Sequence, residues 1–145
     1  MQNLTGSWQF WALLSAAFAA LTAVFAKVGV AGVSPDVATF FRTGVVLAAL
    51  ALLLTVTEQW VWPAEATART WVFLAFSGLA TGASWLCYFR ALQIGDAALV
   101  APIDKLSIVL VALFAVGFLG ERLSALNWAG IALIAGGAVM VAWKG

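Results

Sequence analysis

The residues of this sequence best suited to chemistry are three charged ones that interrupt apolar stretches: Arg42, Asp104 and Lys105. The uncharged runs that follow them, 43–57 and 106–120, have 15 residues each, and such a run covers about 22 Å as an α-helix. Crossing the roughly 30 Å of hydrocarbon in a bilayer takes about 20 residues. If these stretches span a membrane, their helices must begin before the charges and carry them to membrane depth, where charged groups mark candidate functional sites.

Two interpretations of these charges are open on the sequence alone. In the functional one, they form a polar gate or contact a carboxylate or amine of a substrate. Asp104 could also neutralise Arg42 or Lys105, which would lower the cost of about 2.5–3.5 kcal/mol for a charge at the centre of a transmembrane helix. In the alternative, the long side chains snorkel to the membrane interface and serve no substrate.

A third apolar stretch carries hydroxyl and aromatic side chains together. Thr81, Ser84, Trp85 and Tyr88 share one face of a helix because they are three or four residues apart. Such a face could line a pocket for an organic solute, although packing against a neighbouring helix would give the same pattern. Trp85 lies too deep in its stretch to be an interfacial anchor, so it is the first aromatic residue to test by mutation.

Pro102 is expected to break or loosen the helix that contains Asp104. It has no N–H to donate to the carbonyl of Ala98 and its ring crowds the preceding turn. In a membrane, carbonyl groups freed in this way can face a polar cavity. Alternatively, Pro102 lies close enough to the start of its helix to be tolerated there.

The elements that must position these residues are transmembrane helices. Hydrophobic residues make up 65% of the chain and charged residues 9%, whereas soluble domains carry about 25% charged residues. The mean hydropathy is +1.07. We therefore predict an all-α integral membrane protein in a lipid bilayer, with one domain of five transmembrane helices. The expected spans are 8–27, 35–57, 70–91, 97–119 and 124–143.

Local signals mark the turns between these helices. Residues 34–36, Ser-Pro-Asp, supply an N-cap, a first helical proline and an acid in the first turn. Asp96 is a candidate cap for the fourth helix, and Gly120 and Ser124 frame the turn into the fifth. Glu121 and Arg122 are expected to stabilise a turn as a local pair, without contacting a substrate.

Small residues at helical spacing predict close packing between helices. Gly78 and Gly82 form one such pair, and Ala132 and Gly136 form another. Small side chains four residues apart let helix backbones approach each other in lipid. The other interpretation is that alanine and glycine are simply common in membrane helices.

Tryptophan positions support five crossings. Six of the eight tryptophans fall at the same membrane face if the chain crosses five times, as expected for indole rings at an interface. These six are Trp8, Trp11, Trp60, Trp62, Trp71 and Trp128. Trp143 marks the opposite face, and an odd number of crossings places the two termini on opposite sides.

The distribution of basic residues predicts an orientation with the N-terminus outside and the C-terminus in the cytoplasm. Lys27, Arg42, Arg90, Lys105 and Lys144 lie toward the C-terminal face, against only two basic residues, at 69 and 122, on the other. Without Arg42 and Lys105, which lie partly within helices, the excess is three to two. So weak a bias also permits insertion in both orientations.

Composition also excludes several function classes. The net charge of +1 provides no field to attract nucleic acid. The chain has no histidine and a single cysteine, Cys87, so it lacks the commonest catalytic base and the residues of a cysteine metal cluster. We expect no enzymatic activity, no metal and no cofactor.

Two segments resemble the EamA-type domain of the drug/metabolite transporter superfamily. Residues 88–97 (YFRALQIGDA), followed by Ala101 and Pro102, resemble its junction between third and fourth helices. The second segment consists of residues 118–124 (FLGERLS), 130–134 (GIALI) and the pair Gly136-Gly137. The match is specific over 88–143 and looser from Trp8 onward. Typical members contain two five-helix domains, inverted relative to each other, whereas this chain contains one.

The resemblance implies a multi-pass transporter of small metabolites or other organic solutes in a bacterial-type inner membrane, working by alternating access as a homodimer. An antiparallel dimer would restore the family's inverted symmetry; a parallel dimer or a separately encoded partner half remain alternatives. The small multidrug-resistance exporters of the same superfamily use an acid in the first helix, which 8–27 lacks, so proton exchange for cationic drugs is disfavoured. A membrane scaffold or accessory subunit without transport activity is the alternative function.

Overall fold

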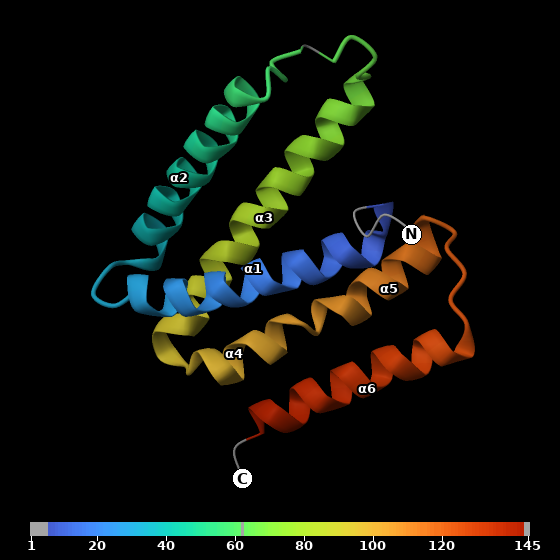
Figure 1. The fold of residues 1–145 in the computed structure, drawn as a ribbon. Helices are drawn as coiled ribbons and strands as arrows, with labels where there is room; N and C mark the ends of the chain where they lie inside the picture. The colour runs from blue at the N-terminus through green and yellow to red at the C-terminus, as the bar shows by residue number, and fades with distance from the viewer. Residues whose placement is uncertain (1–5, 62, 144–145) are drawn as a thin grey trace. The chain divides into compact units, whose positions relative to one another are not determined.

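The computed structural model describes residues 6–61 and 63–143, and over these residues the chain is helical without any strand (Figure 1). Its helices are α1 (Trp8–Gly29), α2 (Pro35–Val56), α3 (Ala68–Ile94), α4 (Ala97–Asp104), α5 (Ser107–Phe118) and α6 (Ala125–Ala142). Since α4 and α5 share one apolar stretch, five helices of the described chain are long and apolar enough to span a membrane. The predicted all-helical, five-span fold is confirmed. Trp62 and Lys144 lie outside the described residues.

The chain divides into two compact units, which are described separately. One contains residues 25–93, with the end of α1, all of α2 and nearly all of α3. The other combines most of α1 with the C-terminal part of the chain from residue 94.

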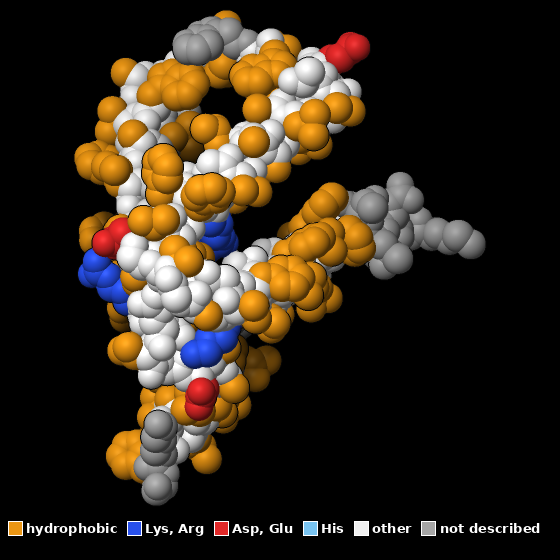
Figure 2. Space-filling view, turned by 90° about the vertical axis from the view of Figure 1, so that its left-hand side faces the viewer, with side chains coloured by type: hydrophobic (Ala, Val, Ile, Leu, Met, Phe, Trp, Pro, Cys, Tyr) orange, Lys and Arg blue, Asp and Glu red, His pale blue; other side chains and the backbone are white. Residues whose placement is uncertain are grey.

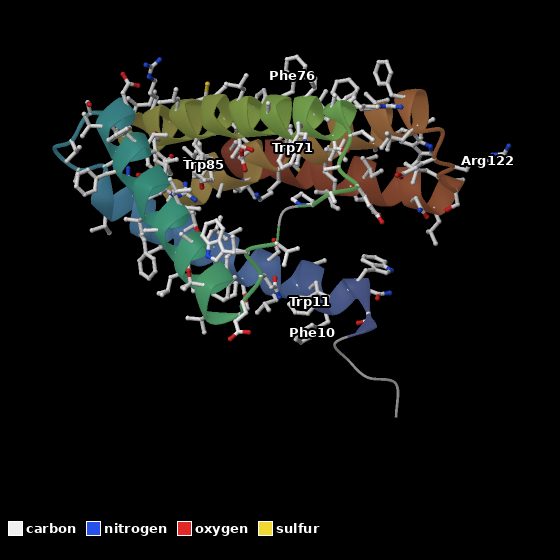
Figure 3. The ribbon with its side chains drawn as sticks, turned by 90° about the horizontal axis from the view of Figure 1, so that it is seen from above. Phe10, Trp11, Trp71, Phe76, Trp85 and Arg122 are labelled. Atoms are coloured by element: carbon white, nitrogen blue, oxygen red, sulfur yellow. The ribbon has the colours of Figure 1, made fainter. Side chains whose placement is uncertain are left out.

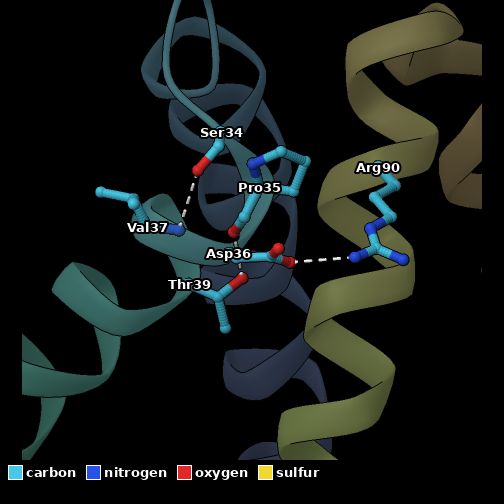
Figure 4. A network of polar contacts seen from close by, with 6 residues as sticks. All are labelled: Ser34, Pro35, Asp36, Val37, Thr39 and Arg90. Atoms are coloured by element: carbon cyan, nitrogen blue, oxygen red, sulfur yellow. Dashed lines mark hydrogen bonds and ion pairs between the residues drawn. The ribbon is translucent and has the colours of Figure 1, made fainter.

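The start of α2 in the 25–93 unit is well capped. Ser34 accepts a hydrogen bond from the backbone N–H of Val37 at 3.3 Å, and Pro35 is the first helical residue. The buried Thr39 hydroxyl donates to the carbonyl of Pro35 at 2.7 Å (Figure 4). These contacts satisfy backbone groups that a helix start leaves without partners, and they confirm the helix start predicted from residues 34–36.

Side chains from α1 and α3 fasten the turn between α1 and α2. Lys27 donates from Nζ to the carbonyl of the fully buried Leu92 at 2.7 Å. Gln93 donates from Nε2 to the carbonyls of Val30, at 3.1 Å, and Val33, at 2.6 Å. The turn is therefore held against the last turn of α3 by polar contacts, in which backbone carbonyls find donors away from water.

In the second unit, both α4 and α5 pack on α6. Lys105 donates its backbone N–H to Pro102 at 3.1 Å and Leu106 donates to Ile103 at 3.0 Å, so the chain between α4 and α5 forms a tighter turn with i→i+3 bonds. Gly120 lies two residues after the end of α5 and has a φ of +70°. Ser124 caps α6 by accepting from the N–H of Asn127 at 3.2 Å.

Apolar side chains dominate the surface of the chain. Figure 2 shows hydrophobic side chains over most of the visible face, with only small patches of charge. Most large apolar residues are exposed within the single chain, as expected when lipid or another protein surface covers them. A Cβ added at Gly78, Gly82 or Gly136 would meet no atom within 4 Å. The close helix approach predicted from these glycines is therefore not made within the described chain.

Candidate functional site

The central feature of the 25–93 unit is an arginine held against aromatic rings inside a membrane span. The guanidinium carbon of Arg42, on α2, lies 4.0 Å from the centroid of the Trp85 ring and 5.5 Å from that of Phe89, both on α3. Arg42 and Trp85 are half-buried, whereas Phe89 is only 3% exposed. Figure 3 shows Trp85 on the side of α3 toward α2 and Phe76 on the opposite side. We call Arg42, Trp85, Tyr88 and Phe89 the arginine–aromatic cluster.

The position of this cluster along α2 and α3 can be measured from an exposed ion pair near the ends of these helices. Asp36, in the first turn of α2, pairs with Arg90 of α3 at 3.1 Å (Figure 4). Arg42 is six residues further along α2 than Asp36 and Trp85 is five residues deeper along α3 than Arg90, or about 9 Å and about 7.5 Å at the rise of an α-helix. The two residues therefore have similar depths, and the guanidinium stays beside α3 instead of extending toward the ends of the helices.

The charge of Arg42 has no carboxylate partner within residues 25–93 as described. The carboxylates of this unit are Asp36, Glu58 and Glu65. Asp36 pairs with Arg90, and the other two belong to the segment between α2 and α3, at the far end of α2. Tyr88 lies three residues after Trp85, on the same side of α3. Within the unit, the negative faces of the rings are thus the main counterpart of the guanidinium.

The face of α3 predicted to line a pocket has four members, and their surroundings differ in the structure. Trp85 contacts Arg42, and Tyr88 is half-buried three residues further along the same side of α3. Thr81 and Ser84 are exposed, and the Thr81 hydroxyl donates to the carbonyl of Ser77 in its own helix at 2.9 Å. Phe89 was missed, although its position four residues after Trp85 places it on the same side of the helix.

Asp104 and Lys105 form a local pair in the second unit. Lys105 Nζ lies 3.1 Å from Asp104 Oδ2, with the carboxylate side chain the less exposed of the two. Both residues lie where the helix breaks between α4 and α5, just after Pro102. Of the two partners expected for Asp104, which were Arg42 and Lys105, the structure shows a pair with Lys105, at an interrupted helix.

Glu121 and Arg122 are exposed in the turn between α5 and α6. Their side chains form no ion pair with each other in the described part of the chain. The turn is instead held by its backbone, since Glu121 donates its N–H to the carbonyl of Ala115 at 3.1 Å. Arg122 points away from the helices of its unit (Figure 3).

The described residues offer no second site of comparable chemistry. A pocket of about 260 Å³ is lined by Lys27, Val30, Ala31, Gly32, Leu92 and Gln93. The side chains of Lys27 and Gln93 there hold backbone carbonyls, so their contacts are structural. Among residues 6–61 and 63–143, no group of three or more His, Cys, Asp or Glu residues could hold a metal ion.

Comparison with known proteins shows the family of the chain. Residues 6–143 match the EamA-like transporter family. The chain is 65% identical over 139 residues to a protein of Sinorhizobium sp. described as "Uncharacterized transporter in cobO 3'region", with 96% of this chain and 99% of that relative aligned. No solved structure matches the chain. The chain belongs to the EamA-like transporter family.

Proposed function

We propose that this membrane transporter moves a small organic solute across the bilayer by alternating access, as a homodimer. The observation that carries the proposal is the arginine–aromatic cluster, because it places a charged side chain without a carboxylate partner in its unit inside a transmembrane helix. Charged residues in such positions are costly and are retained at substrate pathways. Trp85 supplies an aromatic wall beside the charge, and Thr81 and Ser84 supply exposed hydroxyls on the same helix.

The break between α4 and α5 supports the alternating-access part of the proposal. Pro102 lies just before the interruption, and Asp104 and Lys105 lie at it. There, the N–H groups donating to the carbonyl three residues earlier are those of Lys105, Leu106, Ile108 and Val109, and Lys105 also keeps a longer α-helical bond of 3.4 Å to Ala101. Interrupted helices are the usual places where transporter spans change direction and expose backbone carbonyls to a cavity. We infer that α4 and α5 reorient about Lys105 when the pathway opens to the other side.

The length of a relative supports the dimer. Transporter sites usually lie between two repeats of opposite orientation, and five crossings make one repeat. The Sinorhizobium relative, of which 99% is aligned, has the length of one such repeat as well. We propose that a second copy, inserted antiparallel, supplies the missing half, with a parallel copy as the competing arrangement. In the parallel arrangement, the charge bias would place the N-terminus outside in a bacterial-type inner membrane.

Flux into vesicles that contain only this chain tests the function. Purified protein is reconstituted and assayed with amino acids, nucleobases, sugars and cationic amines as labelled solutes. We expect uptake of at least one class above that of protein-free vesicles, and an Arg42→Ala variant reduced at least about tenfold, the equivalent of ~1.4 kcal/mol. Glu121→Gln, in the exposed turn, is the matched control and should transport normally.

A scaffold or accessory subunit predicts a different outcome of the same assay. It would give no flux with any solute and would co-purify stably with another membrane protein. That pair of results would overturn the transport proposal.

A further inference from the structure

We propose that the solute bound at the arginine–aromatic cluster is an organic carboxylate whose carboxyl group pairs with Arg42. This inference rests on the proposed transport function and specifies the substrate class. It follows from the charge, the stacking geometry and the surroundings of Arg42.

The positive charge of Arg42 has no carboxylate partner within residues 25–93 as described. The carboxylates of residues 25–93 are either paired elsewhere or located in the segment beyond the end of α2. Ring faces attract a cation, but they accept no hydrogen bonds from the edge of the guanidinium plane in the way that carboxylate oxygens do. A single positive charge matches one carboxylate, whereas a cationic amine would be repelled.

The geometry leaves the donors of Arg42 available for such a partner. The planar guanidinium of Arg42 lies over the Trp85 ring, with its carbon 4.0 Å from the ring centroid. It carries five N–H donors in a fork that matches the two oxygens of a carboxylate. The contacts with Trp85 and Phe89 hold the guanidinium beside α3, and no ion pair within residues 25–93 as described uses its donors.

The surroundings favour an organic anion over an inorganic one. The aromatic walls beside Arg42 are the half-buried ring of Trp85 and, three residues further along α3, the half-buried phenol of Tyr88, whereas Phe89 is buried. An apolar or aromatic body attached to the carboxylate would gain contact area against these walls. A small hydrophilic anion such as phosphate would interact with the single charge of Arg42 but would gain no contact with the aromatic rings.

Matched ligands test the charge requirement directly. Thermal unfolding of the purified full chain in detergent is followed with acetate, benzoate and indole-3-acetate, and with benzamide, benzylamine and phenyl phosphate as counterparts of benzoate. We expect at least one carboxylate to raise the melting temperature. Titration should show at least about tenfold tighter binding, ~1.4 kcal/mol, than for its uncharged, cationic and phosphate counterparts.

Variants locate the effect at the cluster. Arg42→Gln should weaken carboxylate binding at least about tenfold. Arg42→Lys keeps the charge but not the planar fork, so its affinity for the carboxylate should lie between those of the wild type and Arg42→Gln. Arg90→Gln removes an equivalent side chain from an exposed ion pair on the same helices and should bind like the wild type. If Arg42→Gln fails to fold, Arg42→Lys and Trp85→Phe carry the comparison.

Several outcomes would overturn the inference: no shift with any carboxylate, equal binding of the amide, amine or phosphate, or unchanged binding by the Arg42 variants. Its failure is distinguishable from failure of the proposed function. A solute that crosses vesicles but binds regardless of its charge supports transport and contradicts the carboxylate assignment. A carboxylate that binds through Arg42 but never crosses supports the assignment and contradicts transport.

Discussion

Arg42 shows how one residue can carry a charge in apolar surroundings with no ion pair inside the described 25–93 unit. A charge at the centre of a transmembrane helix costs about 2.5–3.5 kcal/mol. A cation over an aromatic ring recovers about 0.5–2 kcal/mol, depending on how far it is desolvated. The contact with Trp85 therefore offsets only part of the cost. The part of the cost that the ring contact does not offset is expected for a residue that is retained because it binds a substrate.

A double-mutant cycle measures this contact. We expect Arg42→Met and Trp85→Leu to show a coupling of about 1 kcal/mol in the free energy of unfolding, because each substitution removes the same cation–π pair. The measurement is unfolding of purified protein in mixed micelles with increasing SDS. Phe76→Leu, on the opposite side of α3, replaces Trp85→Leu in the control cycle and should show no coupling to Arg42. Additivity of the Arg42 and Trp85 substitutions within about 0.3 kcal/mol would contradict the described contact.

At this scale the sequence was informative about residues but not about their partners. Arg42 and Trp85 could be identified from charge and depth alone, because both are unexpected inside a membrane span. Their contact could not be predicted, since helical periodicity defines a face of one helix without defining which helix lies opposite. Phe89 was missed for the same reason: it is an ordinary apolar residue until Arg42 is placed beside it.

At the scale of elements, short polar signals determine where helices begin. Ser34 and Ser124 accept N–H groups at the starts of α2 and α6, as capping residues do. Asp96 occupies the cap position of α4, but its side chain makes no capping hydrogen bond. The positions of all three turns could be predicted from the sequence. That the side chain of Asp96 makes no capping hydrogen bond could not be predicted.

Cap substitutions distinguish these cases. Ser34→Ala and Ser124→Ala should each lower the free energy of unfolding by about 1 kcal/mol, because each leaves a helix N–H without its acceptor. Asp96→Asn should change it by less than about 0.5 kcal/mol, since no capping bond is lost. The same SDS titration supplies the values. An equal effect at residues 34 and 96 would show that the cap bonds contribute little.

The break between α4 and α5 follows from Pro102 only in part. The missing N–H explains why the helix is weakened near Ala98, but the chain departs from the α-helix at Lys105 and Leu106. The sequence therefore predicted an interruption without its position. The stretch 97–119, expected as one span, contains two helices.

Pro102→Ala tests whether the interruption depends on the proline. We expect slower amide hydrogen exchange at residues 105–108 and a gain of about 1 kcal/mol in the free energy of unfolding, because one helix hydrogen bond is restored. Transport should fall as the hinge stiffens. Pro35→Ala, at a first helical position where the N–H has no partner within the helix, is the control and should leave exchange in α2 unchanged. Unaltered exchange at 105–108 would assign the break to Asp104 and Lys105 instead.

For the whole molecule, a composition of 65% hydrophobic residues predicted a helical membrane protein, because helices satisfy their own backbone groups in lipid. The five spans were predicted from the positions of the charged residues. What covers the exposed apolar faces could not be predicted, because lipid and a second copy select the same side chains. The glycine pair at 78 and 82 illustrates this limit. Its spacing suggests a packing surface, yet no neighbour approaches it within the described chain.

Accessibility of the two ends of α2 tests the central claim, that one five-helix chain is completed by an inverted copy of itself. In a Cys87→Ala background, Ala31→Cys and Ala64→Cys place single thiols in the exposed turns before and after α2. Intact cells and opened membranes are treated with an impermeant maleimide. An antiparallel homodimer predicts that each thiol reacts from both sides, in roughly equal populations because the two orientations are present in equal numbers. Reaction of one thiol only from outside and of the other only from inside would contradict it.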